Sequence, residues 1–343
     1  MKAMVLKGPN LPFQLEQRPD PAAGPGEAVA RVVTCGAGLT IQHAKAGRRK
    51  VQFPRIIGHE ITGEIVETGP GVRGLKVGDA VTTYFYLNCG HCRWCLTSLE
   101  PLCENSGGQV GLECDGAYAE YVKLPAQNFI KLPEGFDYKK HPAEIGVVTD
   151  ALATPYKVLR RARVKAGESV AVIGAGGGLG IHQVMMAKWA RARVLAVDTK
   201  PEKFNACRKA GADEVVDASA GRVAEQLLDL TGGQGVDVVV DYVSATATLE
   251  AGVKALGRRG RLVTLGGSGK PFQVPAADLL NKEQDVLGSR YVTRSEVLES
   301  LDLVARGEVF PLVSLVRPLE EAEAVHELVE RGEVIGRAAL RIS

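Results

Sequence analysis

Four cysteines gather in one short polar stretch, with two-residue gaps between the first three and a longer gap before the last. The short gaps let successive thiolates turn toward one point, and the longer return lets the fourth close a tetrahedron. Zinc prefers four such soft ligands, and a closed all-thiolate set leaves no position for water or substrate. The spacing therefore predicts a structural zinc site held by Cys89, Cys92, Cys95 and Cys103.

Two alternatives to zinc exist for these cysteines. An iron–sulfur cluster has similar ligands, but nothing else in the sequence indicates electron relay. Four unrelated core cysteines are the other interpretation, and a short polar loop is a poor place for them.

A glycine-rich stretch follows a buried apolar run that ends at Ile173, and it opens a segment of helical periodicity. In this context glycines permit a tight turn, close approach of the backbone to a pyrophosphate, and close packing of helix on strand. The helix N-terminus adds free N–H groups and a positive dipole end. The predicted cofactor-binding residues of this turn are Gly174, Gly176, Gly177, Gly178, Leu179 and Gly180.

Asp198 stands at the end of the next apolar run, at about the twenty-residue interval at which an acid binds the adenosine ribose. A carboxylate there accepts hydrogen bonds from the ribose diol and repels a 2′-phosphate, so NAD is favoured over NADP. Lys200 follows without an adjacent Arg and would weaken that repulsion. The alternative is a flexible loop beside an Asp that caps a helix.

Length and composition set the frame for these motifs. A chain of 343 residues exceeds what one hydrophobic core usually supports, so we expect two domains. Hydrophobic residues make up 45% and charged residues 24%, and the net charge is +2, which argues against a nucleic-acid or membrane partner. The basic cluster Arg48-Arg49-Lys50 fits a solvated loop or, alternatively, an anion-steering patch.

The pattern of elements changes along the chain. The first third has short β-like runs separated by Gly and Pro, such as 28–33, 61–66 and 79–81, and predicts a compact β-barrel-like domain. From Ser169 onward strands and amphipathic helices alternate, which predicts a doubly wound parallel sheet, an α/β fold. We expect domains at 1–147, with a zinc lobe at 86–104, and at 148–285. The remaining residues, 286–343, are expected to return to the first domain.

The N-terminus reaches Gly8-Pro9 without an apolar stretch long enough for a signal peptide, and no run elsewhere could span a bilayer. We therefore expect a cytoplasmic protein whose seven cysteines are read for metal rather than for disulfides.

Taken together, the motifs resemble those of the medium-chain, zinc-containing alcohol dehydrogenases, over essentially the whole chain. The motifs that carry this resemblance are the cysteine lobe, the glycine turn, Gly58-His59-Glu60, Val77-Gly78-Asp79, the stretch from Asp115 to Tyr121, and Gly336-Arg337. The resemblance implies a GroES-like catalytic domain plus a Rossmann domain, Arg337 among the cofactor-binding residues, and a homodimer or homotetramer.

The resemblance also implies a second, catalytic zinc, and here the sequence departs from the family. The thiolate ligand position falls on Gly38, and Cys35 lies three residues too early. The remaining candidate ligands are His59, Glu60 and Asp150, and Asp150 could instead cap a helix. Thr40 and His43 fall on the positions that relay the alcohol proton to solvent, although His43 could also be a surface residue without a role.

The expected function is NAD-dependent alcohol oxidation or carbonyl reduction, with zinc as the Lewis acid and a secondary or cyclic alcohol as substrate. Gly38 supports an alternative, a zinc-independent reductase of C=C or C=N bonds. A third interpretation is a cofactor-binding scaffold that has lost its reaction centre, against which the retained Thr40, His43, His59 and Asp150 argue.

Overall fold

The computed structural model describes residues 1–266 and 269–343, which form two compact units. Unit 1 comprises Met1–Ala153 and Val292–Ser343, and unit 2 comprises Thr154–Tyr291. The expected domain boundaries, 147/148 and 285/286, each lie six residues before the boundaries of these units. Helical residues run without a break through position 147/148, and a strand crosses position 285/286, so no linker marks either expected boundary. The elements concerned are α3 (Pro142–Val147), η3 (Val148–Leu152), α4 (Ala153–Ala162) and β14 (Asp285–Gly288).

Unit 1 is built around β3 (Glu27–Ala37), a long strand whose side chains are mostly buried. It pairs antiparallel with β5 (Ile61–Thr68), with β7 (Tyr121–Pro125) and with β16 (Arg337–Arg341). The mixed sheet runs in the order β15-β16-β3-β5-β6-β8, and a smaller antiparallel sheet runs β2-β1-β4. The other strands are β1 (Lys2–Leu6), β2 (Gln14–Gln17), β4 (Arg55–Ile56), β6 (Ala80–Thr83), β8 (Phe129–Lys131) and β15 (Val313–Pro318).

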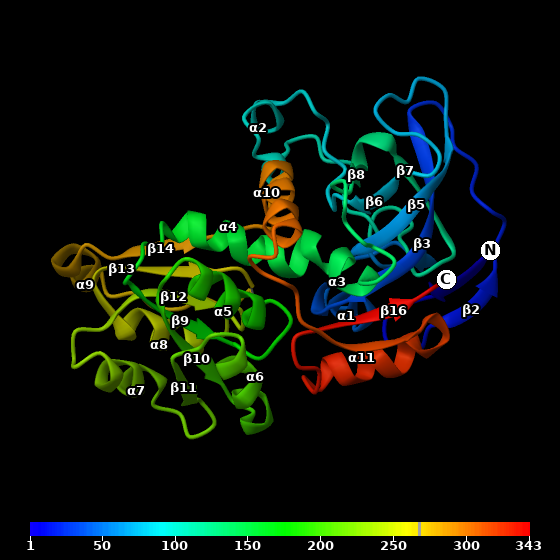
Figure 1. Ribbon diagram of the computed structural model, residues 1–343. Helices are drawn as coiled ribbons and strands as arrows, with labels where there is room; N and C mark the ends of the chain where they lie inside the picture. Colours follow the sequence, from blue (N-terminus) through cyan, green and yellow to red (C-terminus); the bar gives the residue numbers. More distant parts are fainter. Residues whose placement is uncertain (267–268) are drawn as a thin grey trace. The chain divides into compact units, whose positions relative to one another are not determined.

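The C-terminal segment, Val292–Ser343, is part of unit 1. In Figure 1 the red strand β16 lies beside the blue strand β3, and their register pairs Ala338 with Ala37. The helices of this unit are α1 (Leu39–Lys45), α2 (Arg93–Leu96), α3, α10 (Arg294–Ala305) and α11 (Ala322–Glu330), with shorter turns η1 (Glu100–Leu102), η2 (Ala126–Asn128) and η5 (Leu319–Glu321). Thr293 and Glu296 form a capping box that fixes the start of α10.

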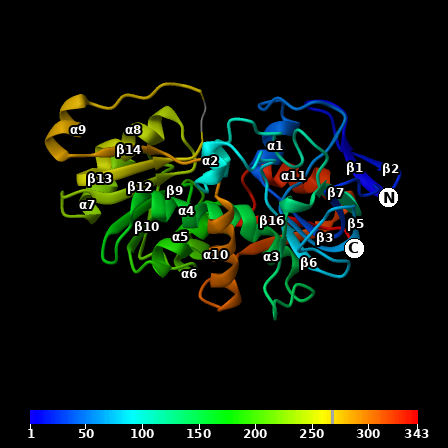
Figure 2. The same cartoon turned by 90° about the horizontal axis from the view of Figure 1, so that it is seen from above.

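Unit 2 is a parallel sheet in the order β11-β10-β9-β12-β13-β14. Figure 2 shows α8 on one face of this sheet and α5 and α6 on the other. The strands are β9 (Ser169–Ile173), β10 (Arg193–Asp198), β11 (Glu214–Asp217), β12 (Val236–Asp241), β13 (Leu256–Thr264) and β14; the helices are α5 (Gly180–Trp189), η4 (Pro201–Lys203), α6 (Phe204–Lys209), α7 (Val223–Leu230), α8 (Thr246–Ala255) and α9 (Ala276–Lys282). The predicted doubly wound α/β fold is confirmed.

The order of the strands decides where unit 2 can bind a ligand. Strand β9 has β10 on one side and β12 on the other, so the chain reverses its direction of travel across the sheet at this point. Ligands of such sheets bind at the carboxyl ends of the strands beside the reversal. That edge carries the glycine-rich turn.

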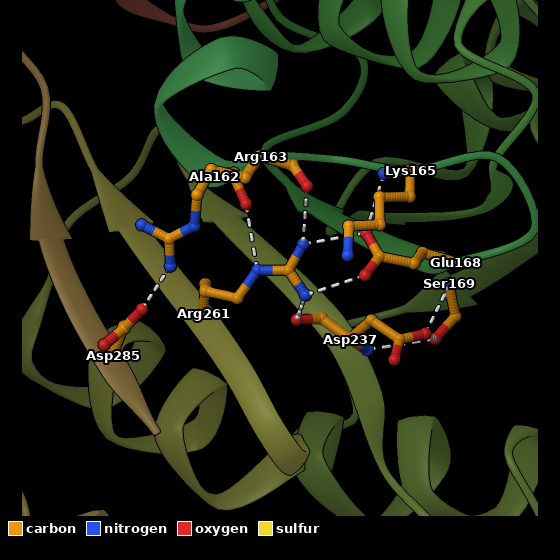
Figure 3. A network of polar contacts seen from close by, with 8 residues as sticks. All are labelled: Ala162, Arg163, Lys165, Glu168, Ser169, Asp237, Arg261 and Asp285. Atoms are coloured by element: carbon orange, nitrogen blue, oxygen red, sulfur yellow. Dashed lines mark hydrogen bonds and ion pairs between the residues drawn. The ribbon is translucent and has the colours of Figure 1, made fainter. Parts of the chain in front are cut away.

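A buried arginine lies at the opposite end of the same sheet. Arg261 on β13 donates to both carboxylate oxygens of Glu168, at 3.0 and 2.7 Å, and to the backbone carbonyl oxygens of Ala162, Arg163 and Asp237. Figure 3 shows its guanidinium enclosed by these groups. Every direction in which this side chain can donate is therefore used in holding the fold together.

Within the described ranges, no helix has both the length and the apolar character needed to span a bilayer.

Candidate active site and zinc lobe

The predicted zinc ligands meet in one lobe of unit 1. Their sulfur atoms lie within 4.8 Å of one another, with separations of 3.6 Å between Cys92 and Cys95, and 3.9 Å for the pairs Cys89–Cys95 and Cys92–Cys103. Zinc bound to four thiolates at about 2.3 Å requires sulfur atoms about 3.8 Å apart. The donor set therefore fits a structural zinc ion without rearrangement.

Backbone N–H groups point at two of these sulfur atoms and stabilise their thiolate form, which binds a cation. The N–H of Cys92 points at the sulfur of Cys89, and the N–H of Cys89 points at that of Cys103, each at 3.4 Å. The backbone amide of Cys95 lowers the pKa of Cys92 to about 6, whereas burial raises the pKa of Cys95 to about 12. Cys95 therefore ionises as the metal binds, and zinc affinity depends on pH.

The glycine turn of unit 2 is compact because two of its glycines allow close contacts. Gly174 has a φ of +79°, in the left-handed region, and the N–H groups of Gly174 and Ala175 both donate to Val197 O on β10. A Cβ on Gly180, the first residue of α5, would lie 2.0 Å from Gly174 O. Only glycine lets α5 start this close to the end of β9.

Asp198 closes the other side of this turn. Its Oδ2 accepts a hydrogen bond from the Gly176 N–H at 2.8 Å, and its Oδ1 accepts one from the Lys200 N–H at 3.1 Å. The structure thus brings the predicted acid to the predicted turn at the carboxyl edge of the sheet. Lys203, which the sequence analysis did not single out, packs its side chain over Gly176, where a Cβ would meet it at 2.6 Å.

The second predicted centre, in unit 1, begins with His59, two residues before the start of β5. Its side chain is 2% exposed, and its ring packs on Phe85 with centroids 4.2 Å apart. Neither ring nitrogen has a hydrogen-bond partner among the described residues. A buried polar atom without a partner is costly, so such an imidazole is a candidate for contacting a ligand.

Arg337, the first residue of β16, lies between the other two predicted residues of this centre. Its Nε donates to Glu60 Oε2 at 2.9 Å, and its Nη2 donates to Asp150 Oδ2 at 3.0 Å. The same Asp150 oxygen lies 3.7 Å from His59 Nε2. All four side chains are buried. Arg337 was expected to bind the cofactor, and its placement here was not predicted. The one signal of it in the sequence was the missing side chain at position 38.

The charges in this centre are strongly coupled. Burial raises the pKa of Glu60, and the nearby Asp150 raises it further, while the guanidinium of Arg337 opposes both. Although burial disfavours a charged arginine, Glu60 and Asp150 raise the pKa of Arg337. The arginine is therefore permanently cationic, and Glu60 carries the variable charge.

Gly38 explains where the guanidinium finds its space. An ideal Cβ at this position would lie 2.4 Å from both Cζ and Nη2 of Arg337. The thiolate that the family resemblance places here would overlap the arginine. Cys35 does not replace it, because its sulfur is buried against Gly58, where a Cβ would meet it at 2.8 Å.

The expected catalytic zinc set of His59, Glu60 and Asp150 does not fit a metal ion in this arrangement. Within the described ranges, the cysteine lobe alone brings three or more His, Cys, Asp or Glu donor atoms to metal-binding separations. The physical reason is the guanidinium, which already engages both carboxylates. Asp150 is not a helix cap either, since it lies inside the helical run at η3.

The two predicted relay residues lie on α1, one turn apart. Thr40 is partly buried and His43 is exposed, and their three-residue spacing puts them on the same side of the helix. Desolvation, and then the positive charge of Arg48, lower the pKa of His43. His43 is therefore neutral near pH 7 and can accept a proton. Arg48, from the basic cluster, forms hydrogen bonds with both carboxylate oxygens of Glu330 on α11.

Comparison with known proteins agrees with this architecture. Residues 24–134 match the family model described as "Alcohol dehydrogenase GroES-like domain", and residues 178–306 match "Zinc-binding dehydrogenase". An alcohol dehydrogenase of Geobacillus stearothermophilus is 34% identical over 345 residues, covering 100% of both chains. An acryloyl-coenzyme A reductase of Metallosphaera sedula is 30% identical over 347 residues, covering 99% of both.

A solved structure described as an NAD-dependent alcohol dehydrogenase superposes with a TM-score of 0.91 at 29% identity, covering 100% of both chains. Similarity of sequence and of fold thus extends from end to end, through both units and the cysteine lobe. The chain belongs to the zinc-containing medium-chain alcohol dehydrogenase family and is an oxidoreductase of that family.

Proposed function

We propose that the protein transfers hydride between NAD and a small alcohol or its carbonyl product. The observation that carries this proposal is the glycine turn of unit 2, which leads into the N-terminus of α5 and whose Gly176 N–H donates to the carboxylate of Asp198. This is the set of groups that a pyrophosphate and an adenosine ribose need. Full-length similarity to alcohol dehydrogenases supports the same activity.

The residues of unit 1 supply the proton chemistry. Oxidation of an alcohol releases a hydride from carbon and a proton from oxygen. The unpartnered imidazole of His59 is the base for that hydroxyl proton, and Asp150, 3.7 Å away, stabilises the imidazolium that forms. Thr40 and the neutral His43 then carry a proton from the centre to solvent.

A second candidate is reduction of a conjugated C=C bond, which the position of Arg337 favours. Without a Lewis acid on the substrate oxygen, hydride addition is easiest where the substrate itself delocalises the negative charge, as an enone or an enoyl thioester does. Hydride would then add to the β-carbon, and His59 would donate the proton to the α-carbon. The acryloyl-coenzyme A reductase among the relatives belongs to the same superfamily as the alcohol dehydrogenases, so its similarity does not favour one reaction over the other.

The test begins with cofactor binding. We expect NADH to bind the full chain with quenched tryptophan fluorescence or a calorimetric signal, and NADPH to bind more weakly. Failure of both cofactors to bind would overturn the proposal. Turnover with matched panels of ketones, enones and enoyl thioesters then separates the two candidates, since a carbonyl reductase consumes NADH with saturated ketones and a C=C reductase does not.

Assembly and location complete the proposal. We expect a homodimer or homotetramer that acts in the cytoplasm, where thiolate ligands stay reduced. Size-exclusion chromatography with light scattering tests the assembly, and a monomeric mass would contradict it.

A further inference from the structure

We propose that the reaction centre of unit 1 holds no catalytic metal and that the guanidinium of Arg337 is its resident cation, so that the chain binds a single zinc ion, in the cysteine lobe. This goes beyond the proposed function and does not depend on which reaction the enzyme performs.

The first support is the filled space at position 38. Three guanidinium atoms of Arg337 lie within 2.6 Å of the point where a Cβ of residue 38 would stand. A ligand side chain and this guanidinium therefore exclude each other. The absence of a side chain at Gly38 and the position of Arg337 are two parts of one arrangement.

The second support is that the anionic donors are already engaged. Glu60 is 1% exposed, and its Oε1 accepts the Ala151 N–H at 3.2 Å while its Oε2 accepts Arg337 Nε at 2.9 Å. Asp150 accepts Arg337 Nη2 at 3.0 Å. A buried guanidinium needs such partners, and it cannot lose its charge by deprotonation. A divalent ion would have to take both carboxylates from it and then lie beside an uncompensated positive charge.

The third support is the contrast with the cysteine lobe of the same unit. There the four donor atoms already stand at the separations of a zinc tetrahedron. Around Arg337 the described residues offer one imidazole and two carboxylates that are held by a cation of the protein itself. One unit thus contains a donor set that fits zinc and another that excludes it.

Metal content of the full chain tests the inference directly. Protein purified with zinc in all buffers, then passed through a desalting column, is expected to contain one zinc per chain by elemental analysis. Cys103→Ser should remove that zinc, whereas His59→Ala should leave it in place. Two zinc ions per wild-type chain, or loss of zinc on His59→Ala, would overturn the inference.

A variant pair tests the reason for the exclusion. The double variant Gly38→Cys/Arg337→Ser removes the guanidinium and restores a thiol beside His59 and Asp150, so a second zinc should bind. The triple variant that adds His59→Ala is the matched control and should lose it again. Cobalt in place of zinc gives an absorption band from the new thiolate as a second readout. If the double variant is folded by circular dichroism and gains no metal, the guanidinium is not what excludes it, and the inference fails in that part.

These outcomes do not depend on catalysis. An enzyme that binds no nicotinamide but contains one zinc would refute the proposed function and support this inference. An enzyme that is active and contains two zinc ions would do the reverse.

Discussion

Two buried arginines, one in each unit, serve different ends. Arg261 in unit 2 donates to one carboxylate and three backbone carbonyl groups, all within the structural end of its sheet (Figure 3). Arg337 in unit 1 donates to two carboxylates from separate parts of the chain, beside an imidazole that has no hydrogen-bond partner among the described residues. The first arrangement is satisfied by the fold alone, and the second brings reactive groups together.

Burial of an arginine side chain has different consequences in the two clusters. Around Arg261 the single carboxylate of Glu168 balances the charge of the guanidinium, and the three carbonyl groups cannot change their charge, so the cluster holds a geometry. Where two carboxylates surround a guanidinium, protons can be taken up or released nearby, and the cluster can do chemistry. We expect the two arginines to differ accordingly when each is removed.

The largest effect is expected for Arg261→Ala. It leaves Glu168 and three carbonyl groups without their donor, so the free energy of unfolding should fall by about 4 kcal/mol. Urea unfolding followed by circular dichroism measures this. Arg259→Ala on the same strand is the matched control, because the Arg259 side chain is 84% exposed, and its loss should have almost no effect. Equal losses for the two variants would show that the Arg261 network does not stabilise the fold.

Removal of Arg337 is expected to cost less stability but more activity. Arg337→Ala should lower the free energy of unfolding by about 3 kcal/mol at neutral pH, because Glu60, whose pKa is raised by burial, can take up a proton in compensation. The turnover number should fall by roughly 100-fold, as when one electrostatic partner is removed from an active site. Arg337→Lys, which keeps the charge but not the paired geometry, should recover part of the stability. Wild-type turnover in the alanine variant would contradict a role in the reaction centre.

The stability loss of Arg337→Ala should also depend on pH. Burial raises the pKa of Glu60 above its ordinary value of 4.5, so its contribution to stability is fully present below pH 4.5 and is lost as the pH rises through the raised pKa. Removing Arg337 takes away the charge that opposes this shift, and the pKa of Glu60 rises further. The gap in unfolding free energy between wild type and Arg337→Ala should therefore widen from pH 5 to pH 8.

A smaller effect is expected at His43. Because its pKa is lowered from 6.5, His43 is a base at neutral pH. Alcohol oxidation should slow as the pH falls through this lowered pKa, since His43 is then protonated. His43→Ala should reduce the turnover number by about 100-fold or less, lose this pH dependence, and recover partly in imidazole buffer. An unchanged pH profile in the variant would exclude His43 from the proton route.

The smallest effect is expected at Asp198. Asp198→Asn keeps an acceptor for the Gly176 N–H but removes the negative charge, so the preference for NADH over NADPH should drop by about tenfold. Asp217→Asn, at the end of the neighbouring strand, is the control and should leave the preference unchanged. The ratio of dissociation constants for the two cofactors measures it.

The local features of the protein could be predicted from its sequence. The cysteine lobe needs only the spacing between Cys89 and Cys103, and the glycine turn needs only a strand, a few glycines and a helix. Alternation of strand and helix determined the doubly wound sheet, because apolar periodicity reports which face of each element is buried. The glycine-rich stretch at 174–180 could likewise be recognised without knowing the rest of the fold.

The groups that meet at the reaction centre could not be predicted, because they come from distant segments of the chain. Arg337 is 277 residues from Glu60 and 187 residues from Asp150, and no local pattern in the sequence links them. Their contact follows from the pairing of β16 with β3, which returns the C-terminal segment to the side of Gly38. Gly38 by itself indicated only that the thiolate ligand of the family is missing. The group that fills the space beside Gly38 is set by packing between distant segments. No pattern of neighbouring residues in the sequence reveals such packing.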